Sequence, residues 1–343
     1  MNIVVTILSV WVCGLLYEIG HVVGAIFGGM SIRLFAFWPF LIIRKPDGSF
    51  KIRLRLRLSA QVAGVYPLVA KTTNLRRRRV FFTAGGPLMS LLVAIVAVKL
   101  GNLCLPAPET TAIANPVDTN PVALFLDYLG LLSGFWCVTS LLPVGIKYYP
   151  TDGAQLIALW KNATWVRATN AILLMQTALW TGKRPRDFDP DWVDDALDLA
   201  DGSQQSFVAH HFAYLYAMDS GESKQAGDYL DRIMKSAEKS WAPNWSVCVL
   251  EYAYYLGRYR GNATSARHWF ERGKSSREAN KAGRYLSEAA VLLAENDLPM
   301  AQKRMEAGLA ALDEVLSAGL AQIQREQLED IGTQIQFRGA LAA

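Results

Sequence analysis

The 343-residue sequence is poor in the side chains that build common metal and redox sites, with only four histidines and four cysteines. The cysteines show no zinc-type spacing, and three lie in or beside apolar segments, so buried free thiols are expected. This usage argues against a cysteine-based zinc module. Three of the four histidines lie in the polar C-terminal half, where surface or packing roles are expected: His210, His211 and His268.

Charge is also scarce at the start of the chain. Between Ile3 and Met30 only Glu18 and His21 can carry charge, over about 28 residues where about 20 suffice to cross a bilayer. No basic residue precedes this stretch, which argues against a cleaved signal peptide and favours a retained span. With two further apolar runs, the sequence predicts three spans, at about residues 3–29, 80–98 and 121–144.

Basic residues are absent from loop 101–120, which holds two acids, whereas residues 31–79 hold twelve Lys or Arg and one acid. The positive-inside rule then places the N-terminus outside and everything after Asp152 in the cytoplasm. The basic loop suits the anionic surface of a lipid bilayer. Because this loop lies between two spans, no nucleic-acid partner is expected. An integral membrane protein is predicted.

A strand is predicted within the basic loop, because residues 51–58 alternate between basic and apolar side chains with the period of a strand. The preceding Pro46-Asp47-Gly48 is a turn signal. With residues 32–44 this predicts a small membrane-associated antiparallel sheet over about 32–58. Two interpretations stay open: a structural hairpin with its apolar face on the spans and its basic face toward headgroups or solvent, or an edge strand that binds a substrate.

The C-terminal half has a helical pattern. Residues 165–180 are predicted to form an interfacial or packed helix, since their uncharged stretch is too short for a span. From about residue 205 a weak repeat suggests a tetratricopeptide-like array of helical hairpins, with an irregular helical domain as the alternative. The repeat consists of turn residues that each stand five positions before an alanine: Gly221 and Ala226, Gly261 and Ala266, Asn296 and Ala301.

The first predicted span contains polar side chains, which are costly in a membrane and therefore indicate a structural or functional role. Tyr17 and His21 are one helical turn apart and share a face, with Glu18 beside them. An acid at the centre of a membrane helix costs about 2.5–3.5 kcal/mol. A buried Glu–His pair that joins two helices is one explanation, and a catalytic site is the other.

Three segments, in order along the chain, resemble the motifs of the site-2 protease family of intramembrane metalloproteases (peptidase family M50). Glu18, Gly20 and His21 match its His-Glu-x-x-His motif, with Tyr17 at the first histidine position. Residues 84–92, Ala-Gly-Gly-Pro-Leu-Met-Ser-Leu-Leu, resemble its Gly-Pro-x-x-Asn helix. The Leu-Leu-Pro at 141–143, followed by the Thr-Asp-Gly at 151–153, resembles its Leu-Pro…Asp-Gly segment. Ser90 and Ser140 stand where the family has asparagine.

The resemblance covers roughly residues 10–160 and implies an α-helical polytopic membrane core with a small sheet over residues 1–160, in a bacterial inner-membrane protein. The helical pattern and the positive-inside rule predict that a cytoplasmic all-α domain follows over residues 161–343. The resemblance also implies a Zn²⁺ cofactor and peptide-bond hydrolysis in or near the bilayer, on a membrane-protein substrate. Zinc in hydrolytic sites takes three protein ligands plus water. The family roles would make Glu18 the general base, His21 and Asp152 ligands and Tyr17 an unusual third ligand, while Gly86, Pro87 and Ser90 would pack or contact substrate.

Alternatives remain open for both the site and the function. Asp152 could simply cap a helix, since Thr-Asp-Gly suits a helix N-terminus. The alternative function is a pseudoprotease that binds membrane segments and recruits a cytoplasmic protein partner through the helical domain. A transporter is disfavoured, because three spans are few and no second, corresponding half is visible.

Overall fold

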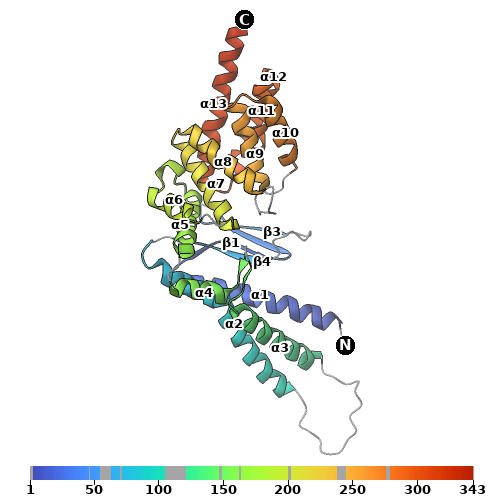
Figure 1. Cartoon of the computed structure of the whole chain (residues 1–343). Coiled ribbons are helices and arrows are strands. Elements are labelled where there is room, and N and C mark those ends of the chain that lie inside the picture. Colours follow the sequence, from blue (N-terminus) through green and yellow to red (C-terminus); the bar gives the residue numbers. More distant parts are fainter. Residues whose placement is uncertain are drawn as a thin grey trace, which may run out of the picture. The chain divides into compact units, whose positions relative to one another are not determined.

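The computed structural model describes residues 3–45, 47–54, 63–69, 72–104, 121–146, 149–161, 164–199, 202–237, 245–275 and 279–342. The protein is mostly α-helical with one small four-stranded antiparallel sheet, which confirms that part of the predicted fold class. The chain divides into two compact units, Met1–Ala163 and Thr164–Ala343. Figure 1 shows the elements of each.

The first unit contains three helices that are long and apolar enough to cross a membrane, as predicted. They are α1 (Ile3–Phe27), α2 (Leu75–Cys104) and α3 (Pro121–Leu141), and all three contact one another. Helix α2 starts earlier than the predicted span, because its four consecutive arginines are good helix formers. A short β5–β6 hairpin (Gly145–Ile146 and Tyr149–Pro150) connects α3 to α4 (Asp152–Lys161).

Glycines set the distance between α1 and α2. A Cβ atom built on Gly20 would overlap the Gly85 carbonyl oxygen, and one built on Gly85 would overlap the Gly20 carbonyl oxygen. A Cβ atom on Gly24 would likewise overlap the Phe81 carbonyl oxygen. The two backbones therefore touch without intervening side chains, as small residues allow in membrane helix pairs.

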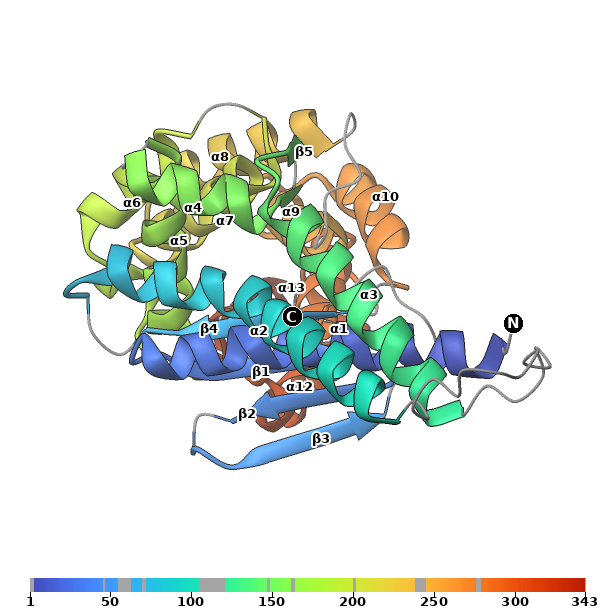
Figure 2. The same ribbon diagram turned by 90° about the horizontal axis from the view of Figure 1, so that it is seen from below.

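The sheet has the strand order β3-β2-β1-β4. In Figure 2, β1 and β4 lie near α1 and β3 lies furthest from it. The predicted strand at residues 51–58 begins one residue earlier, at Phe50, and its residues 55–58 lie outside the described part of the chain. The bounds are β1 (Ser31–Phe37), β2 (Phe40–Arg44), β3 (Phe50–Leu54) and β4 (Ala63–Leu68).

Within the described part of the chain, the sheet meets α1 through β1 and β4. Phe37 packs edge-on against Trp11 of α1, and the Trp11 indole donates a hydrogen bond of 2.9 Å to the Trp38 carbonyl. Strand pairing places Phe40 and the apolar residues of β3 on the same face of the sheet as Phe37. The apolar side chains of β3 are about two-thirds exposed: Phe50 65%, Ile52 66% and Leu54 64%. Within the described residues 50–54, the apolar side chains of β3 are therefore largely uncovered.

The second unit consists of helices. Helix α5 (Thr164–Trp180) packs into its core through Ile172 and Met175, which confirms a packed helix. The remaining helices are α6 (Pro190–Leu197), α7 (Gln204–Asp219), α8 (Ser223–Ala237), α9 (Trp245–Arg258), α10 (Ala263–Gly273), α11 (Lys281–Ala294), α12 (Leu298–Ala310) and α13 (Ala318–Ala342), with 3-10 turns at Pro185–Asp187 and Leu312–Glu314.

Three helical hairpins of this unit turn at the residues that the sequence repeat singled out. Gly221, Gly261 and Asn296 all have positive φ, the left-handed conformation that favours glycine and asparagine after a helix. These residues connect α7 to α8, α9 to α10 and α11 to α12. The alanines of the repeat are fully buried where paired helices approach: Ala226, Ala266 and Ala301.

Candidate functional site

The candidate site in the first unit begins on one face of α1. Tyr17 and His21 are one turn apart, and their rings meet edge-to-face with centroids 4.9 Å apart. The Tyr17 ring also lies 6.2 Å from that of Trp136 on α3, and the His21 ring 5.2 Å from that of Phe82 on α2. Both side chains therefore point between the three apolar helices.

Asp152 reaches the same place from the start of α4. The Thr151 hydroxyl accepts a hydrogen bond of 3.3 Å from the Ala154 N–H, so Thr151 takes the helix-capping role that was the alternative for Asp152. The next residue, Gly153, has no room for a Cβ atom beside the Leu141 carbonyl. This close packing of α4 on the end of α3 holds the Asp152 carboxylate, which is only 9% exposed.

The three residues at the predicted ligand positions converge. The Tyr17 hydroxyl donates a hydrogen bond to Asp152 Oδ2, and His21 Nε2 lies 3.6 Å from the same oxygen. Tyr17 and Asp152 are 135 positions apart in the chain. One imidazole nitrogen, one phenol oxygen and one carboxylate thus face a common point.

A backbone carbonyl fixes the orientation of the His21 ring. His21 Nδ1 lies 2.9 Å from the Phe82 carbonyl oxygen, and because a carbonyl only accepts, Nδ1 must carry the proton and donate it. In a neutral ring Nε2 is then the free lone pair, and it faces Asp152. Partners of this kind orient histidines that bind metals.

Glu18 lies beside this cluster and not within it. Its carboxylate is half-buried and close enough to Asp152 for their charges to interact. Burial raises the pKa of Asp152, while His21 and Tyr17 act to lower it. The site therefore holds two carboxylic acids: Asp152, which contacts Tyr17 and His21, and Glu18, which lies beside this cluster.

Of the α2 residues singled out in the sequence, Gly86 lies against His21. A Cβ atom on Gly86 would overlap His21 Nε2, so only glycine leaves this edge of the ring open. Pro87 is buried within α2. Ser90 is 1% exposed, and its hydroxyl has no hydrogen-bond partner within the described part of the chain. The hydroxyl of Thr83, also buried, shares this property and was not singled out.

The basic loop has a structural use that its composition did not predict. The Arg78 guanidinium donates to the Gly28 and Gly29 carbonyls, at 3.1 and 2.6 Å, where α1 ends. Cations at a helix C-terminus bind the unpaired carbonyls and oppose the helix dipole. Part of the basic excess therefore fixes α1 against α2 instead of facing lipid.

Comparison with protein-family models, curated proteins and solved structures finds no match to this chain. The geometry of the described residues and the sequence motifs are therefore the basis for a functional proposal.

Proposed function

We propose that this chain is a membrane-embedded zinc peptidase of the site-2 protease type, which hydrolyses a peptide bond of a membrane-protein substrate in or near the bilayer. The observation that carries the proposal is the convergence of Tyr17, His21 and Asp152 between three apolar helices. These residues come from two motifs far apart in the sequence. A metal ion that all three residues bind would require their side chains to converge in this way.

The donor set fits Zn²⁺. Imidazole nitrogen and carboxylate oxygen are common zinc ligands, and His21 already presents an oriented Nε2 lone pair. Tyr17 supplies an oxygen at the third position, which zinc would bind after loss of the hydroxyl proton. When bound, zinc would lower the pKa of a water molecule and polarise the substrate carbonyl.

The chain's own residues then have distinct tasks. Glu18, adjacent to the ligand set, acts as general base and accepts a proton from the water molecule that attacks the peptide bond. Gly86 leaves the His21 edge open, and the Ser90 hydroxyl offers a hydrogen bond inside the helix bundle. Strand β3 ends the sheet, so an extended client segment can add to its edge through backbone hydrogen bonds.

The proposal includes the membrane orientation: α1 to α3 span a bacterial inner membrane, the N-terminus lies outside and residues 164–343 are cytoplasmic. The tetratricopeptide-like array of helical hairpins in that domain recruits a protein partner. Protease added outside spheroplasts is expected to spare the C-terminal domain, whereas lysed spheroplasts lose it. Digestion of the domain in intact spheroplasts would overturn the orientation.

A second candidate, a pseudoprotease, is favoured by one contact. The Tyr17 hydroxyl donates to Asp152, so the two groups satisfy each other without a metal ion. Such a chain would hold membrane segments in the same place without cutting them. The two candidates predict different metal contents.

Measurement of the zinc content of the purified full-length protein in detergent distinguishes the peptidase from the pseudoprotease. For the peptidase we expect zinc at this site, at least about tenfold weaker binding in Tyr17→Phe, and tighter binding in Tyr17→His, which restores an imidazole on the same helix face. Tyr128→Phe, another tyrosine on a span, is the control and should change nothing. Zinc that is unaffected by Tyr17→Phe but gained in Tyr17→His would instead establish the pseudoprotease.

A further inference from the structure

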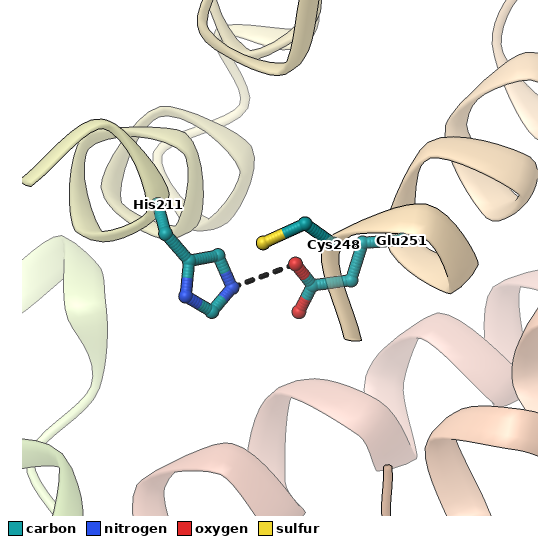
Figure 3. A group of neighbouring side chains, drawn as sticks. All are labelled: His211, Cys248 and Glu251. Atoms are coloured by element: carbon teal, nitrogen blue, oxygen red, sulfur yellow. Dashed lines mark hydrogen bonds and ion pairs between the residues drawn. The ribbon is translucent and has the colours of Figure 1, made fainter. Parts of the chain in front are cut away.

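A second group of metal-binding side chains lies in the helical unit, away from the site described above. Figure 3 shows His211 on α7 facing Cys248 and Glu251 on α9. His211 Nε2 lies 2.6 Å from Glu251 Oε2, and the three donor atoms all lie within 4.8 Å of one another. Among the described residues this is the one cluster of three or more His, Cys, Asp or Glu with such spacing.

The helix pairing explains why the sequence concealed this group. Cys248 and Glu251 are three residues apart, so they project from neighbouring positions on α9. His211 comes from the preceding hairpin and was expected only to pack or face solvent. Packing of α7 and α9 in one core, with Cys248 fully buried, brings the three together.

We propose that His211, Cys248 and Glu251 form a zinc site in the helical unit. Thiolate, imidazole and carboxylate are the three ligand types that zinc combines, and the borderline-soft thiolate disfavours magnesium and calcium. With bonds of about 2.0–2.3 Å, tetrahedral geometry separates ligand atoms by about 3.3–3.8 Å. The three donor atoms, all within 4.8 Å of one another, already lie close to this spacing.

We place the fourth ligand on the Glu251 side of the cluster. Glu251 also borders a pocket between α7, α9, α11 and α13, together with Tyr214, Ser287 and Gln324. Gln324 is 7% exposed, and its Oε1 has no hydrogen-bond partner in the described part of the chain. The polar groups in the wall of this pocket allow water or a small donor to serve as the fourth ligand. The site is therefore of the three-ligand, open type.

The Tyr214 ring stabilises the arrangement from one side. It is 1% exposed and lies parallel to the His211 imidazole, at 14° and 6.2 Å between centroids. Because Tyr214 is part of the buried core, it limits rotation of the His211 ring. Restricted ligands lose less entropy when a metal binds.

Cobalt binding to the full-length protein in detergent tests the proposal. Co²⁺ added to metal-free protein is expected to give a near-ultraviolet thiolate-to-cobalt band, which the thiol-free Tyr17–His21–Asp152 site does not produce. Cys248→Ser should lose that band, while His211→Gln and Glu251→Gln should weaken cobalt binding by at least about tenfold. Added zinc should displace the cobalt and abolish the band.

Matched controls keep the result specific. Cys137→Ser removes a buried free thiol on α3 and should leave the band unchanged, as should Asp152→Asn. A wild-type protein without the band at excess cobalt would overturn the proposal and leave His211 and Glu251 as a partly buried hydrogen-bonded pair. A band that persists in Cys248→Ser would overturn it too. Neither outcome bears on the membrane site, because the band requires a thiolate.

Discussion

Gly85→Ala is expected to destabilise the membrane unit by about 2 kcal/mol, because overpacked interfaces lose about 1–3 kcal/mol. The added Cβ would overlap the Gly20 carbonyl oxygen and lie 3.1 Å from the Gly24 Cα, so backbone and not a flexible side chain must move. Separation of α1 from α2 would also displace His21 from the Phe82 carbonyl. The measurement is thermal unfolding of the full-length protein in detergent.

Gly134→Ala on α3 provides the matched control. A Cβ atom there meets only the Ala94 Cβ, at an ordinary 3.9 Å. This substitution should be neutral, or stabilising by up to about 1 kcal/mol, since alanine favours a helix over glycine. Equal effects of the two substitutions would contradict close backbone contact between α1 and α2.

The largest expected effect on activity is that of Glu18→Gln. Removal of a general base typically costs about 10²–10⁴-fold in rate. Glutamine keeps the size of the side chain but cannot accept the proton at neutral pH. Because Glu18 lies beside the ligand cluster and not in it, we expect the variant to fold and to retain zinc. Hydrolysis and metal binding should therefore separate in this variant.

A second acid on a span provides its control. Asp127 on α3 is exposed, close to where Gly101 of α2 lies. Asp127→Asn removes one carboxylate from the membrane unit without touching the cluster around Asp152. It should leave hydrolysis within about twofold of the wild type.

The apolar helices were predictable because length and composition alone identify a span. The faces of the sheet were harder to predict. Alternation identified the strand, yet alternation does not reveal how far a neighbouring helix extends. The apolar residues of β3 continue the face that Phe37 presents to α1 but lie beyond that helix.

For the candidate site, motif order indicated which residues to compare, and the fold determined their geometry. The meeting of Tyr17 with Asp152 depends on the packing of α4 against α2 and α3, which no local pattern encodes. The Phe82 carbonyl that orients His21 was equally hidden, since a backbone atom carries no sequence signal.

The His211 cluster shows a further limit of reading the sequence. Metal sites are recognised in sequences when ligands follow short, regular spacings. Here the third ligand comes from another hairpin, 40 positions from Glu251, so only helix packing reveals it.

Identification of new protein termini in cells that express this chain is the most direct test of the central claim. Membrane-protein fragments with new ends within or beside apolar segments should be detected in cells that express the wild type. The same fragments should be at least about 100-fold less abundant with Glu18→Gln at equal protein level, and unchanged with Asp127→Asn. Identical sets of termini in cells with wild type and Glu18→Gln would contradict a peptidase and leave a protein that only binds membrane segments.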